Sequence, residues 1–152
     1  MPAGDRSVTA EIRIDARPEA VFPFLTEPDR IVRWKGVEAH VEATPGGAYR
    51  VHVTRRDVAV GEYVQIEPPR RVVFTWGWEG DDQLPPGSST VEIELLPDGD
   101  GTIVRLTHSG LPEGTDVGQL EGWKHFLPRL AAVAAGDDPG PDPWVDGTMG
   151  TT

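Results

Sequence analysis

The chain has 152 residues, with 25 acidic and 14 basic side chains for a formal net charge of −11, and it contains no cysteine. A surface this acidic repels phosphate backbones and argues against nucleic-acid binding. The lack of cysteine excludes disulfides and thiolate metal sites. No segment reaches the roughly 20 apolar residues needed to cross a bilayer, and the N-terminus lacks a signal-peptide run. We therefore expect a soluble cytoplasmic protein without stable membrane association.

The N-terminal part predicts one strand followed by two short helices. Apolar and polar residues alternate from Val8 to Ile14, as in a half-buried strand. The next segments, DARPEAVFPFL and TEPDRIVRW, each place a proline where it suits the first turn of a helix. Pro23 limits the length and regularity of the first of these helices.

The middle of the chain predicts six further strands. They alternate in polarity or are rich in β-branched and aromatic residues, and they span residues 37–43, 48–53, 58–66, 71–78, 89–96 and 102–109. Turns such as TPGG, EPPR and PDGDG separate them. Because a parallel pair would need a crossover of about a dozen residues, these short connections favour one antiparallel meander.

A long amphipathic helix is predicted from about Val117 to Ala135. Its apolar stripe recurs at spacings of three and four residues and comprises Leu120, Trp123, Leu127, Leu130 and Ala134. Pro128 removes a hydrogen bond midway along this helix, and Gly122 also weakens it. His125 falls off the stripe, so we expect it to be solvated.

Beyond this helix the sequence is rich in proline, glycine and aspartate. We therefore expect a single domain at residues 1–136 and a disordered acidic tail at residues 137–152. Trp144 is the exception in the tail, since it either docks on the domain or stays in a flexible segment.

Strand alternation predicts a candidate binding site. Phe74, Trp76 and Trp78 share one face of their strand, and we expect this face to point toward the long helix. Bulky aromatics on a curved sheet either fill a core or wall a ligand pocket. The candidate ligand-binding residues are Phe22, Trp34, Tyr49, Val51, Phe74, Trp76, Trp78, Leu106, His108, Trp123, Phe126, Leu127 and Leu130.

Two polar side chains are candidates for chemistry. His108 is predicted to point inward, either as a hydrogen-bonded core histidine or as an acid or base. Glu62 shares the parity of the valines in its strand. Either a bulge at Gly61 turns it outward, or it is a buried acid with a raised pKa. No HExxH, GxSxG or phosphate-binding loop occurs, so we assign no catalytic residue, metal ligand or cofactor.

Three stretches, in this order, carry a family resemblance: RPEAVFPFLTEPDRIVRW, GEYVQIEPPRRVVFTWGWE and LEGWKHFLPRLAA. Together they resemble the activator of heat-shock-protein-90 ATPase homologue family of the SRPBCC, or START-like, superfamily. The resemblance covers about Val8 to Ala135. It implies an α+β helix-grip fold, in which a seven-stranded curved antiparallel sheet wraps a long C-terminal helix over a cavity, with two short helices after strand 1. Lys35 departs from the family pattern, which often has a second tryptophan there, and this predicts a more polar or open wall.

The resemblance implies three functions. Members bind or transfer apolar molecules such as lipids and polyketides, a minority catalyse cyclisation or hydrolysis, and the eukaryotic namesake stimulates a chaperone. We expect non-enzymatic binding of a small, mostly hydrophobic molecule between sheet and helix. One alternative is a polyketide cyclase-like or hydrolase-like enzyme using His108 or Glu62. The other is a chaperone-associated or self-resistance interaction protein, in which self-association stays open.

Overall fold

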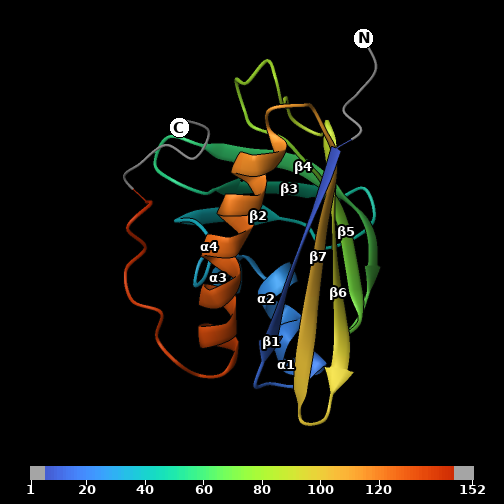
Figure 1. The fold of residues 1–152 in the computed structure, drawn as a ribbon, viewed down its shortest axis with the longest axis vertical. Coiled ribbons are helices and arrows are strands. Elements are labelled where there is room, and N and C mark those ends of the chain that lie inside the picture. The colour runs from blue at the N-terminus through green and yellow to red at the C-terminus, as the bar shows by residue number, and fades with distance from the viewer. Residues whose placement is uncertain (1–5, 146–152) are drawn as a thin grey trace.

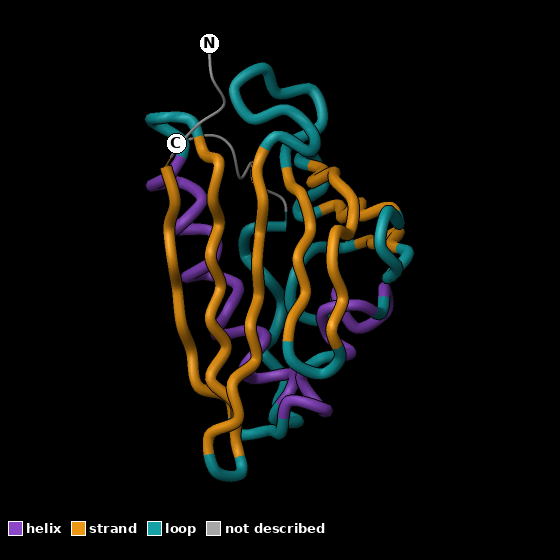
Figure 2. The backbone as a smooth tube through the Cα atoms, turned by 90° about the vertical axis from the view of Figure 1, so that its right-hand side faces the viewer, coloured by secondary structure: helices purple, strands orange, loops and turns teal. Residues whose placement is uncertain are grey.

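The computed structural model describes residues 6–145 and shows one antiparallel sheet that curves around a long helix (Figure 1). The seven strands are β1 Arg6–Ile14, β2 Glu38–Val41, β3 Ala48–His52, β4 Val58–Glu67, β5 Arg71–Trp76, β6 Ser89–Asp98 and β7 Gly101–Leu111. Their order in the sheet is β1-β7-β6-β5-β4-β3-β2. The predicted meander is confirmed, and the first strand extends it at one edge by pairing with the last strand. Figure 2 shows the strands as one layer with the long helix behind them.

Three single-turn helices, where two were predicted, connect β1 to β2. They are α1 Pro18–Val21, α2 Pro23–Thr26 and α3 Pro28–Ile31, and each begins at a proline. A proline at the first helical position lacks only an N–H that would be unpaired there anyway. Pro23 cannot donate the bond that would continue α1, so the chain starts a new turn instead.

The long helix, α4, spans Asp116–Ala134 and lies alongside β1 (Figure 1). It continues through Pro128 and buries one face against the sheet: Gly122, Trp123, Phe126, Leu127 and Leu130. No side chain caps its N-terminus. Within residues 6–145, no helix is long and apolar enough to span a membrane.

The inward-facing residues predicted in β3, β5 and β7 are buried. The prediction was wrong for β4, where Ala59 and Tyr63 face inward and Glu62 is exposed. The register shift lies between Tyr63 and Gln65, so neither a bulge at Gly61 nor a buried acid at Glu62 occurs. Gly61 serves another purpose, because a Cβ there would lie 1.9 Å from the carbonyl oxygen of Thr75. Glu62 therefore cannot act inside the sheet.

Residues 137–145 return along α4 and contact it. Arg129 donates a hydrogen bond to the carbonyl oxygen of Gly140 at 2.9 Å, and the His125 ring lies 2.7 Å from a carboxylate oxygen of Asp142. Trp144 stacks on His125 with ring centroids 3.8 Å apart and an interplanar angle of 4°. Trp144 thus docks, and the expectation of a solvated His125 was wrong. The rest of the expected tail, residues 146–152, lies outside the described residues.

Candidate functional site

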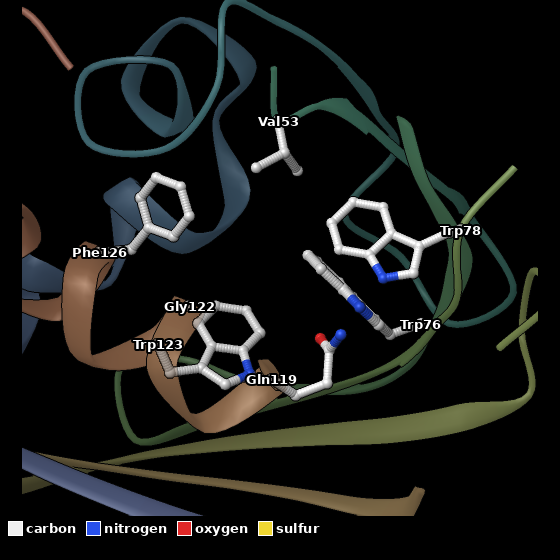
Figure 3. A pocket seen from close by; sticks show the side chains of 7 residues that line it. All are labelled: Val53, Trp76, Trp78, Gln119, Gly122, Trp123 and Phe126. Atoms are coloured by element: carbon white, nitrogen blue, oxygen red, sulfur yellow. The ribbon is translucent and has the colours of Figure 1, made fainter. Parts of the chain in front are cut away.

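A small pocket opens between the first turns of α4 and the sheet (Figure 3). Its lining residues are Val53, Trp76, Trp78, Gln119, Gly122, Trp123 and Phe126. Trp76 and Trp78 come from the sheet side and face Trp123 and Phe126 from α4 across the opening. The free volume is about 10 Å³, close to what one water molecule needs. The side chains that wall the pocket therefore also occupy most of it.

Four of the thirteen candidate ligand-binding residues line this pocket: Trp76, Trp78, Trp123 and Phe126. The other nine are buried in the adjoining core without lining it: Phe22, Trp34, Tyr49, Val51, Phe74, Leu106, His108, Leu127 and Leu130. The set as a whole stays a prediction.

Three lining residues were not among the predicted ones. Val53 continues the inward alternation of β3, and this signal was present in the sequence. Gln119 and Gly122 precede Trp123 and Phe126 by four residues each, which places them on the same helical face. Helical spacing from the two aromatics would have found both.

The tryptophans of the pocket pack closely. The Trp76 ring centroid lies 5.3 Å from that of Trp78, at an interplanar angle of 74°, and 5.1 Å from that of Trp123. Within the described part of the chain, the buried Trp76 Nε1 has no hydrogen-bond acceptor. A buried N–H without a partner is rare and costs free energy. The pocket wall thus holds an unused donor.

His108 is buried beside this cluster with both ring nitrogens occupied. Trp123 Nε1 donates to His108 Nδ1 at 3.0 Å, and His108 Nε2 lies 2.7 Å from Ser89 Oγ. Because the Ser89 hydroxyl donates to the carbonyl oxygen of Trp76, we assign the ring proton to Nε2. Burial, with a smaller contribution from the charge of Lys35, lowers the pKa of His108 to about 3. His108 is therefore a neutral core histidine.

Lys35, expected at a more polar or open wall, is instead 2% exposed in the centre of the core. Its ammonium donates to the Tyr49 hydroxyl at 2.5 Å. Five aromatic rings face the Nζ atom at centroid distances from 4.8 to 5.7 Å: Trp34, Tyr49, Phe74, Trp76 and Trp123. Burial lowers the pKa of Lys35 to about 7. An amine that titrates near neutrality thus lies next to the pocket wall.

Among the described residues, one surface cluster could hold a metal ion. Glu38 and His40 of β2 and His52 of β3 project from the outer face, with ligand atoms all within 4.8 Å of one another. Imidazole and carboxylate ligands suit zinc and related divalent ions. The cross-strand pairing of Glu38 with His52, which brings the three side chains together, was not predicted from the sequence.

A larger groove of about 490 Å³ lies between the turn after α3, the end of α4 and residues 136–142. Its polar lining includes Arg33, Arg129, Asp137 and Asp138. It lacks the aromatic walls that an apolar ligand requires, so the tryptophan-lined pocket fits the expected class of ligand better.

The curved antiparallel sheet and the long helix packed against it define an SRPBCC-type fold. The profile described as "Activator of Hsp90 ATPase homolog 1-like protein" matches residues 15–135. The chain belongs to this family. Among curated proteins no match was found.

Three solved structures show the likeness in detail. An AHSA1-like protein from Rhizobium etli is 47% identical, with 95% of this chain and 92% of that chain covered and a TM-score of 0.74. CalU16 from Micromonospora echinospora is 32% identical over 93% of this chain and 80% of that chain, with a TM-score of 0.74. DynU16, a protein in the dynemicin biosynthetic locus, is 26% identical over 88% of this chain and 49% of that chain, with a TM-score of 0.73.

Proposed function

We propose that the protein binds a small, mostly hydrophobic molecule at the tryptophan-lined pocket between α4 and the sheet, and that it does so without catalysing a reaction. The observation that carries this proposal is the wall of four aromatic side chains, Trp76, Trp78, Trp123 and Phe126, around one opening. Aromatic walls with few polar groups are typical of sites for apolar ligands. We also propose a cytoplasmic location, as expected from the sequence.

A ligand larger than water needs the pocket to widen, and the first turns of α4 are the element suited to move. This end of the helix has no side-chain cap and contains Gly118 and Gly122. Each glycine costs a helix about 1 kcal/mol relative to alanine. Val117 in the first turn is 68% exposed, so its side chain adds little packing that would keep this end of the helix against the sheet. Displacement of this end would separate Trp123 from Trp76.

The enzymatic alternative has less support. Its two proposed acid–base groups were His108 and Glu62. His108 is neutral with both nitrogens hydrogen-bonded, and Glu62 lies on the outer face. A general acid or base must reach the substrate with a proton to exchange. Neither group meets this condition, which favours binding over catalysis.

Chaperone association or self-association is the second candidate, and the family assignment favours it. The small number of exposed apolar side chains in the described part of the chain gives such an association less support. Among residues 6–145, the large hydrophobic side chains that are exposed are Val37, Val64 and Val117. Stable interfaces usually have an apolar centre. Light scattering of the protein alone and with an Hsp90 chaperone tests this candidate, and a monomer that forms no complex would exclude it.

The pocket can be tested through the indole N–H signals of the five tryptophans in a ¹⁵N-labelled sample. N-phenyl-1-naphthylamine, a neutral aromatic probe, is titrated into the protein. We expect the signals of Trp76, Trp78 and Trp123 to shift. Trp34, which donates to the Phe24 carbonyl in the core, and Trp144, which stacks on the outside of α4, serve as internal references. Equal shifts in all five, or none at saturating probe, would refute the proposal.

A matched pair of variants on α4 adds a control. Gln119→Phe places a ring in the mouth of the pocket, whereas Glu121→Phe adds the same ring at an exposed position of the same helix. We expect Gln119→Phe to weaken probe binding about tenfold or more, which corresponds to about 1.4 kcal/mol. Glu121→Phe should leave the affinity unchanged.

A further inference from the structure

Lys35 is a buried cation without a counter-charge. Its one hydrogen bond goes to the neutral Tyr49 hydroxyl, and in the described part of the chain no carboxylate forms an ion pair with it. The aromatic rings around Nζ offer cation–π attraction. Taking an ammonium out of water costs several kcal/mol unless a partner compensates. An ammonium also carries three donors, so two of them have no acceptor.

The same region offers a second unused donor. Trp76 Nε1 is buried and unpaired, and the Trp76 ring lines the pocket. The group that would satisfy both Lys35 and Trp76 is an acceptor, and the ammonium favours an acceptor with negative charge.

The pocket and the ammonium share two walls. The rings of Trp76 and Trp123 line the pocket, and the same two rings lie 5.0 and 4.9 Å from Lys35 Nζ. If either indole changes its rotamer, the pocket extends toward the ammonium. The opening of α4 proposed above would have the same effect, because it displaces Trp123 together with the helix and breaks its bond to His108.

We propose that the molecule bound in this pocket is an aromatic acid whose anionic group pairs with the Lys35 ammonium and accepts a hydrogen bond from Trp76 Nε1. The inference rests on the proposed function and narrows its ligand class from any apolar molecule to one with a single acidic group. The protein surface makes this choice unexpected, since a net charge of −11 repels anions in general. A preference for the anion must therefore come from a specific site.

Among the described residues around this site, Lys35 is the group that changes charge between pH 6 and 9. The titratable side chains that face it are Tyr49 of β3, with Tyr63 of β4 beside Tyr49, and His108 of β7. Burial raises the pKa of both tyrosines and lowers that of His108 to about 3. All three stay neutral in this range, whereas the pKa of Lys35 is about 7. Binding of an anion should therefore weaken as the pH rises.

Two dyes that differ by one group provide the test. 8-Anilinonaphthalene-1-sulfonate carries a sulfonate that N-phenyl-1-naphthylamine lacks. Affinities of both are measured by fluorescence on the full chain, and the indole N–H signals confirm the binding site. At pH 6 we expect the sulfonate to bind about tenfold or more tightly than the neutral dye, as one charge-assisted hydrogen bond implies. The ratio should fall as the pH rises to 9.

Lys35→Met should reduce this ratio to about one, because methionine fills the space without a charge. The control is Lys124→Met, which removes the same charge from an exposed position of α4. If Lys35→Met does not fold, the pH series on the unmodified chain decides alone.

Each outcome separates the inference from the proposed function. Equal affinities for the two dyes at pH 6, or an anion preference that persists in Lys35→Met or at pH 9, would overturn the aromatic acid and leave the apolar pocket standing. If neither dye shifts the pocket indoles, both proposals fall together.

Discussion

Lys35 and His108 are two buried basic side chains that contact the same pair of tryptophans, Trp76 and Trp123, yet their surroundings differ. Each nitrogen of His108 has a hydrogen-bond partner, and Ser89 extends the network to the Trp76 carbonyl. Lys35 has one neutral partner and otherwise faces aromatic rings. The core thus contains one basic side chain, His108, whose hydrogen-bonding groups all have partners, and one, Lys35, whose ammonium has a single hydrogen-bond partner among the described residues.

The difference separates a structural role from a binding role. A fully satisfied buried network fixes one arrangement of the side chains around it. An incomplete one costs stability and is retained where a further partner can join it. On this comparison His108 stabilises the closed position of Trp123 through a bond that opening would break, and Lys35 is the side chain that we propose pairs with a ligand.

The largest effect is expected for His108→Ala. The substitution leaves a cavity and removes the partners of Trp123 Nε1 and Ser89, so it should cost about 3 kcal/mol or more. Urea unfolding at pH 7 measures the loss. Ser89→Ala is the control, since it removes the two bonds of the Ser89 hydroxyl but keeps His108 and its bond to Trp123, and it should cost less, about 1 to 2 kcal/mol. If both variants lose the same amount, His108 is not the fixed centre of this network.

Lys35→Met should change the pH dependence of stability. The pKa of Lys35 is about 7 in the folded protein and 10.5 without burial. Between these values the unfolded state binds more protons, so stability rises with pH. Relative to Lys35→Met, the unmodified protein should therefore gain about 2 kcal/mol of unfolding free energy between pH 7 and 9, at about 1.4 kcal/mol per pH unit. If the difference in unfolding free energy between the two proteins stays constant from pH 7 to 9, the Lys35 ammonium has the partners it needs in the core, and the contrast with His108 is lost.

The smallest effect is expected for Gly118→Ala, which tests the proposal that this end of α4 opens toward Lys35. A Cβ at this position meets no other atom within 4 Å. Alanine should therefore stabilise the helix by about 0.5 to 1 kcal/mol and weaken dye binding, because opening becomes more costly. Gly114→Ala adds the same methyl just before the helix, where φ is +92°, and should destabilise instead. Unchanged dye binding in a stabilised Gly118→Ala would show that this end does not open.

Most of the fold could be predicted because alternation and helical spacing report directly on which face is buried. β4 was the exception among the strands. Its valines mark an apolar row that in fact faces outward, with Val64 51% exposed, whereas the inward row uses Ala59, Gly61 and Tyr63. A small residue is required at Gly61 by the approach of Thr75, and no pattern within β4 itself reveals this long-range contact.

The candidate site was predictable only in part, for a related reason. Trp76, Trp78, Trp123 and Phe126 were found because they lie on regular elements with a defined period. Lys35 follows three proline-initiated turns, where the chain has no period that could indicate burial. A lysine is also among the residues least often buried. Its position in the core emerges from the packing of Tyr49, Phe74 and Trp76 around it.

The edge-to-face packing of Trp76 and Trp78, at an interplanar angle of 74°, has a consequence for the circular dichroism of the protein. Two indoles at this separation couple their electronic transitions, and the coupling depends strongly on the angle between them. The near-ultraviolet circular dichroism of the unlabelled protein should therefore carry a signature of the closed pocket. Protonation of Lys35, whose Nζ lies 5.0 Å from the Trp76 ring centroid, alters the electric field at this chromophore. The circular dichroism of these tryptophans should therefore report on the protonation of Lys35 and on the closed arrangement of the pocket.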